Sequence, residues 1–176
     1  MLIDAHRCRL LVIDVQTRLL PAIADSQSVL DQILWLVRLA KRLGVPISAS
    51  EQYPQGLGTT HAGLLKELPD NCVSEKIHFS CVAAGILGQA NEQWVICGIE
   101  SHVCVLQTAI ELKGAGHEVF VVESGVGSRR HADKATALER MRQAGIEIVS
   151  AEMFAFECLR TAGTPLFREI SREFLR

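Results

Sequence analysis

Short apolar runs typical of buried strands alternate with amphipathic stretches along the whole chain. Residues 9–15 form a nearly continuous apolar run, the pattern of a strand that is covered on both faces. Residues 28–43 then place apolar side chains at helical spacing, and Gly44 followed by Pro46 ends that pattern. Further strands are predicted at 45–50, 73–77, 94–97, 119–122 and 146–149, and further helices at 101–113, 132–143 and after 151. This alternation predicts an α/β fold with a parallel sheet covered by helices.

The composition narrows the class of protein. The chain has 176 residues, so we expect a single domain that spans residues 1–176. Eighteen Lys and Arg stand against 20 Asp and Glu, and the net charge of −2 gives no electrostatic footprint for a nucleic acid. The apolar runs are too short to span a membrane, and charged residues follow Met1 too closely for a signal peptide. We therefore expect a cytoplasmic protein with neither a membrane nor a nucleic acid as partner.

The six cysteines have no C-x-x-C motif and no regular spacing. A disulfide framework belongs to small secreted domains, which this chain does not resemble. Free cysteine commonly behaves as a small buried hydrophobic residue. We therefore assign five of the six to packing or to the surface, namely Cys8, Cys72, Cys81, Cys97 and Cys158.

Three chemically useful residues follow predicted strands, where open α/β sheets bind their ligands. Asp14 ends the first strand, Lys76 ends the third, and Cys104 lies in the turn and helix start after the fourth. Each has an ordinary structural interpretation by itself. Asp14 could cap a loop, Lys76 could be a solvated surface lysine, and Cys104 could belong to the core.

Taken together, these three residues could perform nucleophilic catalysis. A thiolate is the reactive form of cysteine, and a lysine or a helix N-terminus lowers the pKa of a thiol. A nearby carboxylate can take the thiol proton and later hand it to a leaving group. Backbone N–H groups in the turn 98–104 could face a developing oxyanion. The combination therefore favours a catalytic role for Asp14, Lys76 and Cys104.

Several motifs resemble the isochorismatase-like cysteine hydrolases. They are Ile-Asp-Val-Gln at 13–16, the lysine at 76 and Cys-Gly-Ile-Glu-Ser-His-Val-Cys-Val at 97–105. The stretch Glu-Gln-Tyr-Pro-Gln-Gly-Leu-Gly at 51–58 is most similar to the isochorismatase-domain-containing subgroup. The resemblance runs in order from about residue 9 to residue 148. It implies a three-layer α/β/α sandwich with a six-stranded parallel sheet, and a homo-oligomer.

The resemblance also implies roles for individual residues. Asp14 would be the general base, Lys76 the cation that stabilises the thiolate, and Cys104 the nucleophile. The family has a cis peptide bond at the position that matches Ile99-Glu100. The backbone N–H groups of Glu100 and Cys104 would then form the oxyanion hole.

Two departures within the family refine the expected reaction. Isochorismatases proper hydrolyse a vinyl ether without the cysteine, so the presence of Cys104 favours hydrolysis of an amide or another C–N bond through a thioester. Nicotinamidases of the family bind a metal through an Asp-x-His pattern after the second strand. Here residues 51–54 read Glu-Gln-Tyr-Pro, and no histidine follows before His61. We therefore expect a small-molecule substrate, no catalytic metal and no cofactor.

The neighbours of the triad are candidates for the substrate pocket. Tyr53, Phe79 and His102 are expected to line it, because they adjoin the triad residues and the loop after the second strand. Arg129 and Arg130 could start a helix or lie on a solvated face, or they could hold an anionic group of a substrate.

The α/β pattern by itself is compatible with two other classes of protein. A dinucleotide-binding oxidoreductase would need a G-x-G-x-x-G turn after the first strand, and residues 14–18 read Asp-Val-Gln-Thr-Arg. A non-catalytic interaction module that retains the hydrolase scaffold stays open, because a complete triad does not by itself establish a substrate.

Overall fold

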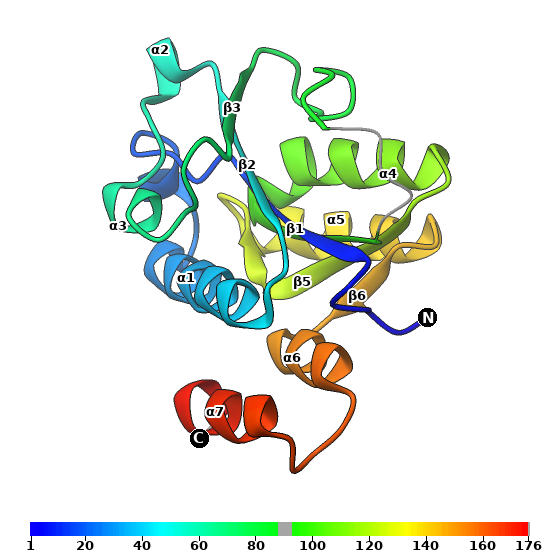
Figure 1. The fold of residues 1–176 in the computed structure, drawn as a ribbon. Coiled ribbons are helices and arrows are strands. Elements are labelled where there is room, and N and C mark those ends of the chain that lie inside the picture. Colours follow the sequence, from blue (N-terminus) through cyan, green and yellow to red (C-terminus); the bar gives the residue numbers. More distant parts are fainter. Residues whose placement is uncertain (88–92, 176) are drawn as a thin grey trace.

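A computed structural model describes residues 1–87 and 93–175, and within them the chain forms a six-stranded sheet (Figure 1). Its strands are β1 (Cys8–Ile13), β2 (Ile47–Gln52), β3 (Val73–Lys76), β4 (Gln93–Ile99), β5 (Glu118–Gly127) and β6 (Glu147–Val149). Their spatial order is β3-β2-β1-β4-β5-β6, and every neighbouring pair is parallel. The predicted α/β fold with a six-stranded parallel sheet is thus confirmed.

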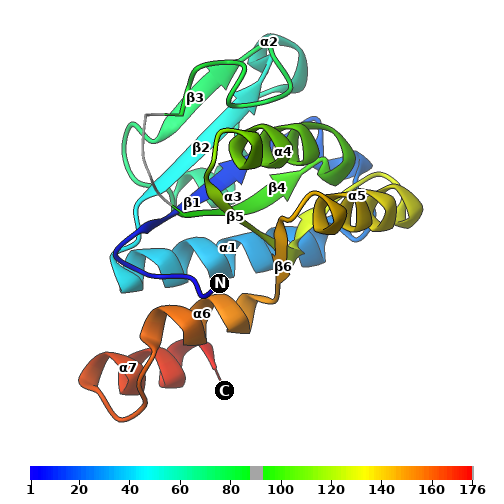
Figure 2. The same cartoon turned by 90° about the vertical axis from the view of Figure 1, so that its right-hand side faces the viewer.

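Helices cover both faces of this sheet (Figure 2). One face carries α1 (Ser26–Leu43), α6 (Ala151–Leu159) and α7 (Pro165–Phe174), and the other carries α4 (Leu106–Gly114) and α5 (His131–Gln143). Two hydrophobic clusters form between the layers, because successive side chains of each strand point to opposite faces. In β1, Leu10 and Val12 join the cluster under α1, whereas Leu11 and Ile13 join the cluster under α4 and α5.

The predicted helix at 28–43 is α1, which begins two residues earlier, at Ser26. Its apolar stripe is buried against the sheet, and Gly44 ends it with a left-handed φ of 71°. The C-terminal helix α7 packs on α1, where the rings of Trp35 and Phe174 meet edge to face at 5.7 Å. Within the described residues, no helix combines the length and the apolar character that crossing a bilayer requires.

The connection after β2 is more regular than the sequence indicated. The strand predicted at 45–50 continues two residues further, because β2 ends at Gln52. Pairing with β3 extends it into polar residues that the hydrophobic pattern does not mark. Two short helices then follow, α2 (Pro54–Leu57) and α3 (Ala62–Leu65). An additional short helical turn, η1 (Leu20–Ala22), lies between β1 and α1.

Strand β5 is the other main difference from the expected boundaries. It continues well past residue 122 and ends at Gly127, with a register shift opposite β4 between Ile96 and Gly98. Small residues permit this extension beneath α1. A methyl group on Gly125 would lie 2.8 Å from the Leu36 side chain. The extended end of β5 lies beside the end of β4, next to the turn that carries Cys104.

Candidate active site

The three predicted catalytic residues come from three strand ends at the carboxyl edge of the sheet. Asp14 directly follows β1, Lys76 is the last residue of β3, and Cys104 lies in η2 (Ser101–Val105), a π-helical turn after β4. The Nζ atom of Lys76 lies 2.7 Å from Oδ2 of Asp14, and both side chains are fully buried. The fold therefore brings together groups that are 62 residues apart in the chain.

Asp14 is held in place from both sides. Its Oδ1 atom accepts a hydrogen bond of 2.7 Å from the Ser50 hydroxyl, and its Oδ2 atom accepts one from Lys76. Its backbone has a φ of 53°, in the left-handed region that aspartate tolerates better than most residues. A buried carboxylate must be paired and hydrogen-bonded to remain charged, and both of its oxygens have donors here.

The Lys76 ammonium has three donors, and all three have acceptors in the structure. They donate to Oδ2 of Asp14 at 2.7 Å, to Oε1 of Gln52 at 2.8 Å and to the backbone carbonyl of Phe79 at 3.0 Å. Lys76 consequently acts on Cys104 through its charge rather than through a hydrogen bond.

Cys104 is almost completely buried, with 5% of its surface exposed. Burial raises the pKa of its thiol, and the charge of Asp14 together with a hydrogen bond to that carboxylate raises it further. The charge of Lys76 lowers it, as the sequence indicated, but does not outweigh the other effects. The expectation of a lowered thiol pKa is therefore wrong. At neutral pH Cys104 is a thiol beside a carboxylate.

The turn between β4 and Cys104 contains the Ile99-Glu100 peptide bond, which is cis. The carbonyl of Glu100 accepts hydrogen bonds from the backbone N–H groups of Val103 and Val105, at 3.1 and 3.2 Å. These bonds tie the start of η2 to the end of β4. The backbone around Cys104 is therefore well ordered by local contacts.

The opposite rim of the site is formed by the end of β5. Glu100 is buried and forms an ion pair with Arg129, whose Nε atom lies 3.2 Å from Oε1. His102 Nδ1 lies 3.0 Å from the hydroxyl of Ser128. Arg130 directly precedes α5, which agrees with the expectation that it could start a helix. The guanidinium of Arg129 thus already has a carboxylate partner.

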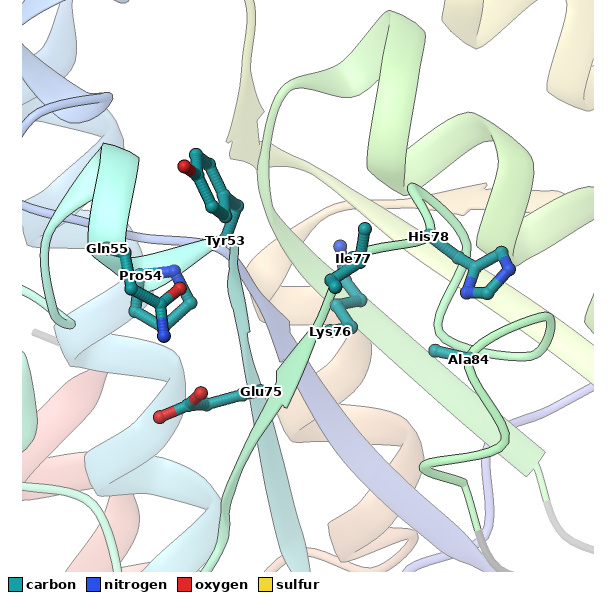
Figure 3. A pocket seen from close by; sticks show the side chains of 8 residues that line it. All are labelled: Tyr53, Pro54, Gln55, Glu75, Lys76, Ile77, His78 and Ala84. Atoms are coloured by element: carbon teal, nitrogen blue, oxygen red, sulfur yellow. The ribbon is translucent and has the colours of Figure 1, made fainter.

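A cavity of about 390 Å³ opens beside the triad (Figure 3). Its lining residues are Tyr53, Pro54, Gln55, Glu75, Lys76, Ile77, His78 and Ala84. Of the three side chains expected to line a substrate pocket, Tyr53 lies here, whereas Phe79 and His102 are not among these residues. Lys76 is the one triad residue in the lining, and Cys104 is not part of it. The cavity therefore adjoins the triad without containing the Cys104 thiol.

Sequence reasoning missed three polar groups around the triad. Ser50 and Gln52 of β2 contact Asp14 and Lys76, and their i, i+2 spacing in a strand places them on one face. Cys81 was assigned to packing or the surface, and it is fully buried. It nevertheless lies within the electrostatic reach of Asp14 and Lys76, and burial raises the pKa of its thiol. The sequence did contain a signal for Ser50 and Gln52, because polar residues at alternate positions of a buried strand indicate a polar site on one face.

Comparison with known proteins identifies the family of this chain. The family model of the isochorismatase domain matches residues 8–153. The chain therefore belongs to the isochorismatase family and is an isochorismatase-family hydrolase. This confirms the resemblance drawn from the sequence motifs.

Named relatives extend over most of the chain. It is 34% identical over 170 residues to isochorismatase family protein 1B of Dictyostelium discoideum, covering 92% of this chain and 82% of that one. It is also 34% identical over 171 residues to isochorismatase domain-containing protein 2A of Mus musculus, covering 93% and 80%. A relative from Phytophthora sojae, 35% identical over 176 residues and covering 95% and 84%, is named a secreted isochorismatase effector.

Solved structures share the fold. A structure described as the MAR1 ribonuclease of Caenorhabditis elegans superposes with a TM-score of 0.92 at 30% identity, over 100% of this chain and 93% of that one. The YcaC gene product of Escherichia coli, described as an octameric hydrolase of unknown specificity, gives a TM-score of 0.84 at 24% identity, over 92% and 83%. At that identity the second likeness concerns the fold alone.

Proposed function

We propose that this protein is a cysteine-dependent hydrolase that cleaves an amide or another C–N bond of a small molecule. The observation that carries the proposal is the fully buried Asp14–Lys76 pair next to the Cys104 thiol. A buried ion pair is costly to maintain. Burial also raises the pKa of the Cys104 thiol beside it, and residues with shifted pKa values are concentrated at functional sites. Neither a metal nor a cofactor is part of the proposed chemistry.

The first half of the reaction transfers an acyl group to the protein. Asp14 takes the proton of the Cys104 thiol while the sulfur attacks the substrate carbonyl carbon, which forms a C–S bond and a tetrahedral oxyanion. The backbone N–H groups of Glu100 and Cys104 are the proposed donors to this oxyanion. Collapse breaks the C–N bond, Asp14 returns the proton to the leaving nitrogen, and a thioester remains on Cys104.

The second half releases the acyl group. A water molecule gives a proton to Asp14 and attacks the thioester carbon, and the C–S bond then breaks. The carboxylic acid leaves, and the proton returns to the Cys104 sulfur. Because burial keeps the resting thiol protonated, the base must act in the same step as the attack. The charge of Asp14 acts on that thiol and raises its pKa, so Asp14 is the residue suited to this role.

A screen of small primary amides with mass detection tests the proposal. We expect the wild-type protein to release ammonia and to show, during turnover, an adduct with the mass of the acyl group on Cys104. Cys104→Ala should lose both signals and keep its fold, because the substitution removes only the sulfur. Cys72→Ala is the matched control, since Cys72 is a half-buried thiol outside the triad. If Cys104→Ala hydrolysed the amide at the wild-type rate, the assignment of Cys104 as the nucleophile would be refuted.

Ribonuclease activity is a second candidate, favoured by the description of the Caenorhabditis elegans structure. The net charge of −2 opposes it, because proteins bind the phosphate backbone through clustered positive charge. Incubation with a labelled RNA separates the two candidates. RNA cleavage that Cys104→Ala abolishes, without amide turnover in the wild type, would replace the amidase proposal. An absence of both activities would favour a non-catalytic interaction module.

We further propose that the protein is cytoplasmic, that residues 1–176 form a single domain, and that several copies of the chain assemble into a homo-oligomer. All six cysteines are free thiols, as is usual in a reducing compartment. Closed symmetric assemblies are common among enzymes, and light scattering on the purified protein measures the number of subunits.

A further inference from the structure

Strand β2 supplies a side chain to each member of the Asp14–Lys76 pair. Ser50 donates to Oδ1 of Asp14, and Gln52, two residues later on the same face, accepts from Nζ of Lys76. Gln52 is 7% exposed, so its amide makes these contacts out of solvent. The contact with Lys76, at 2.8 Å, is intermediate in length between the other two hydrogen bonds of the ammonium, at 2.7 and 3.0 Å.

The amide of Gln52 has a fixed orientation. Its Nε2 atom donates to the carbonyl of Ile77 at 2.7 Å, which leaves Oε1 directed at Lys76. The backbone of Gln52 is held as well, because the side chain of Gln16 donates to its carbonyl at 2.9 Å and accepts from its N–H at 2.8 Å. Gln52 therefore presents one acceptor in one direction.

We propose that Gln52 is a positioning residue that holds the Lys76 ammonium against Asp14, so that the lysine charge stays where it assists removal of the Cys104 proton. This inference rests on the proposed function. Gln52 acts through Lys76 and does not touch the reacting atoms.

The neutrality of Gln52 is part of this role. Lys76 has three donors, and of its three acceptors only Asp14 carries a charge. A carboxylate in place of the amide would compete with Asp14 for the ammonium and would add negative charge near the sulfur. An apolar side chain would leave one buried N–H of Lys76 without a partner and would remove one of the three contacts that hold the ammonium in place. Either change should make the Cys104 thiol harder to deprotonate.

Alkylation by iodoacetamide measures this property without a known substrate. The rate of alkylation at Cys104 is measured by peptide mass spectrometry at a series of pH values. The resulting pH profiles are compared for the wild type, Gln52→Met and Thr60→Val. In Gln52→Met we expect the midpoint of the profile to move upward by about one pH unit, which is about a tenfold slower reaction at a fixed pH below the midpoint. Gln52→Glu, which keeps an oxygen for Lys76, should also move it upward and serves if Gln52→Met does not fold.

Thr60→Val is the matched control. Its hydroxyl makes a buried hydrogen bond of 2.7 Å to Glu51, the neighbour of Gln52 in β2, and it does not contact the triad. It should lower the melting temperature and leave the midpoint unchanged. A wild-type Cys104 that never reacts, at pH values where the unfolded protein reacts, would overturn the proposed function and this inference together. A reactive Cys104 with an unchanged or lower midpoint in the Gln52 variants would overturn the positioning role alone.

Discussion

The Asp14–Lys76 pair illustrates how burial governs the behaviour of individual residues. Both side chains are inaccessible to solvent, so neither charge can be satisfied by water if its partner is lost. Removing one partner of a buried pair costs far more than the pair contributes, because the remaining charge is left uncompensated. The pair is therefore a demanding element of the fold as well as a proposed part of the chemistry.

We expect Lys76→Met to destabilise the protein by about 3–5 kcal/mol, because the Asp14 carboxylate would remain buried without its cation. Asp14→Asn should also be destabilising, and the double variant should cost less than the sum of the two. Urea denaturation of the four proteins measures this coupling. Arg42→Ala removes ion pairs with Glu169 and Glu173 in which all the side chains are about half exposed, and it should cost only about 1 kcal/mol. If the effects of the two substitutions on the free energy of unfolding were additive, Asp14 and Lys76 would not be a coupled ion pair.

The approach of β4 to β1 is the element-scale feature on which the site depends. Gly98 has a φ of 125°, and a methyl group there would lie 2.1 Å from the carbonyl oxygen of Ile13. No side chain fits this position, because the obstructing atoms belong to the backbone of the neighbouring strand. The close contact joins Ile13, which immediately precedes Asp14, to Gly98, which lies two residues before Glu100.

Gly98→Ala should therefore destabilise the protein by about 3 kcal/mol or more, or prevent folding. The control is Gly114→Ala at the end of α4, where a methyl group meets nothing within 4 Å. Alanine is the better helix former, so this change should be neutral or stabilising by up to about 1 kcal/mol. Guanidinium denaturation curves of the two variants provide the comparison. Equal stabilities would show that the strands can separate at Gly98 without cost.

The elements show which parts of the structure the sequence could predict. Strand-end positions identified Asp14, Lys76 and Cys104, because parallel strands deliver their following residues to one edge whatever the exact register. Ser50 lies inside β2, and Gln52 ends β2 two residues beyond the strand that the sequence predicted. Their contacts depend on the register of β2 with its neighbours, which no local pattern determines. The increase in the Cys104 pKa was also missed, because the burial that causes it depends on packing from the whole fold.

At the scale of the whole molecule, the thiols couple stability to pH. Burial raises the pKa of the Cys97 thiol, which lies inside β4, well above the ordinary value. Because the folded-state pKa exceeds the unfolded one, the contribution of this thiol is complete below about pH 8.5. It is lost as the pH rises further, since the unfolded chain then ionises while the folded chain cannot.

The free energy of unfolding should therefore fall in alkaline solution, and Cys97→Ala should make that fall shallower by about 1.4 kcal/mol per pH unit above about pH 8.5. Urea denaturation at several pH values between 7 and 10 measures the two slopes. Val95→Ala is the control, since it removes apolar volume from a fully buried position of the same strand without removing a titratable group. It should lower stability equally at every pH. Parallel curves for Cys97→Ala and the wild type would refute the coupling.

The distance along the chain between Asp14 and Lys76 has a consequence for how the site comes into being. The pair closes across 62 residues, and its members belong to strands that are separated in the sheet by β2. Contacts of such sequence separation form only after the entropy of closing a long loop has been overcome. Within the described residues, no single helix or strand pair contains both members of this pair. The candidate site is therefore complete only once β1, β2 and β3 have paired.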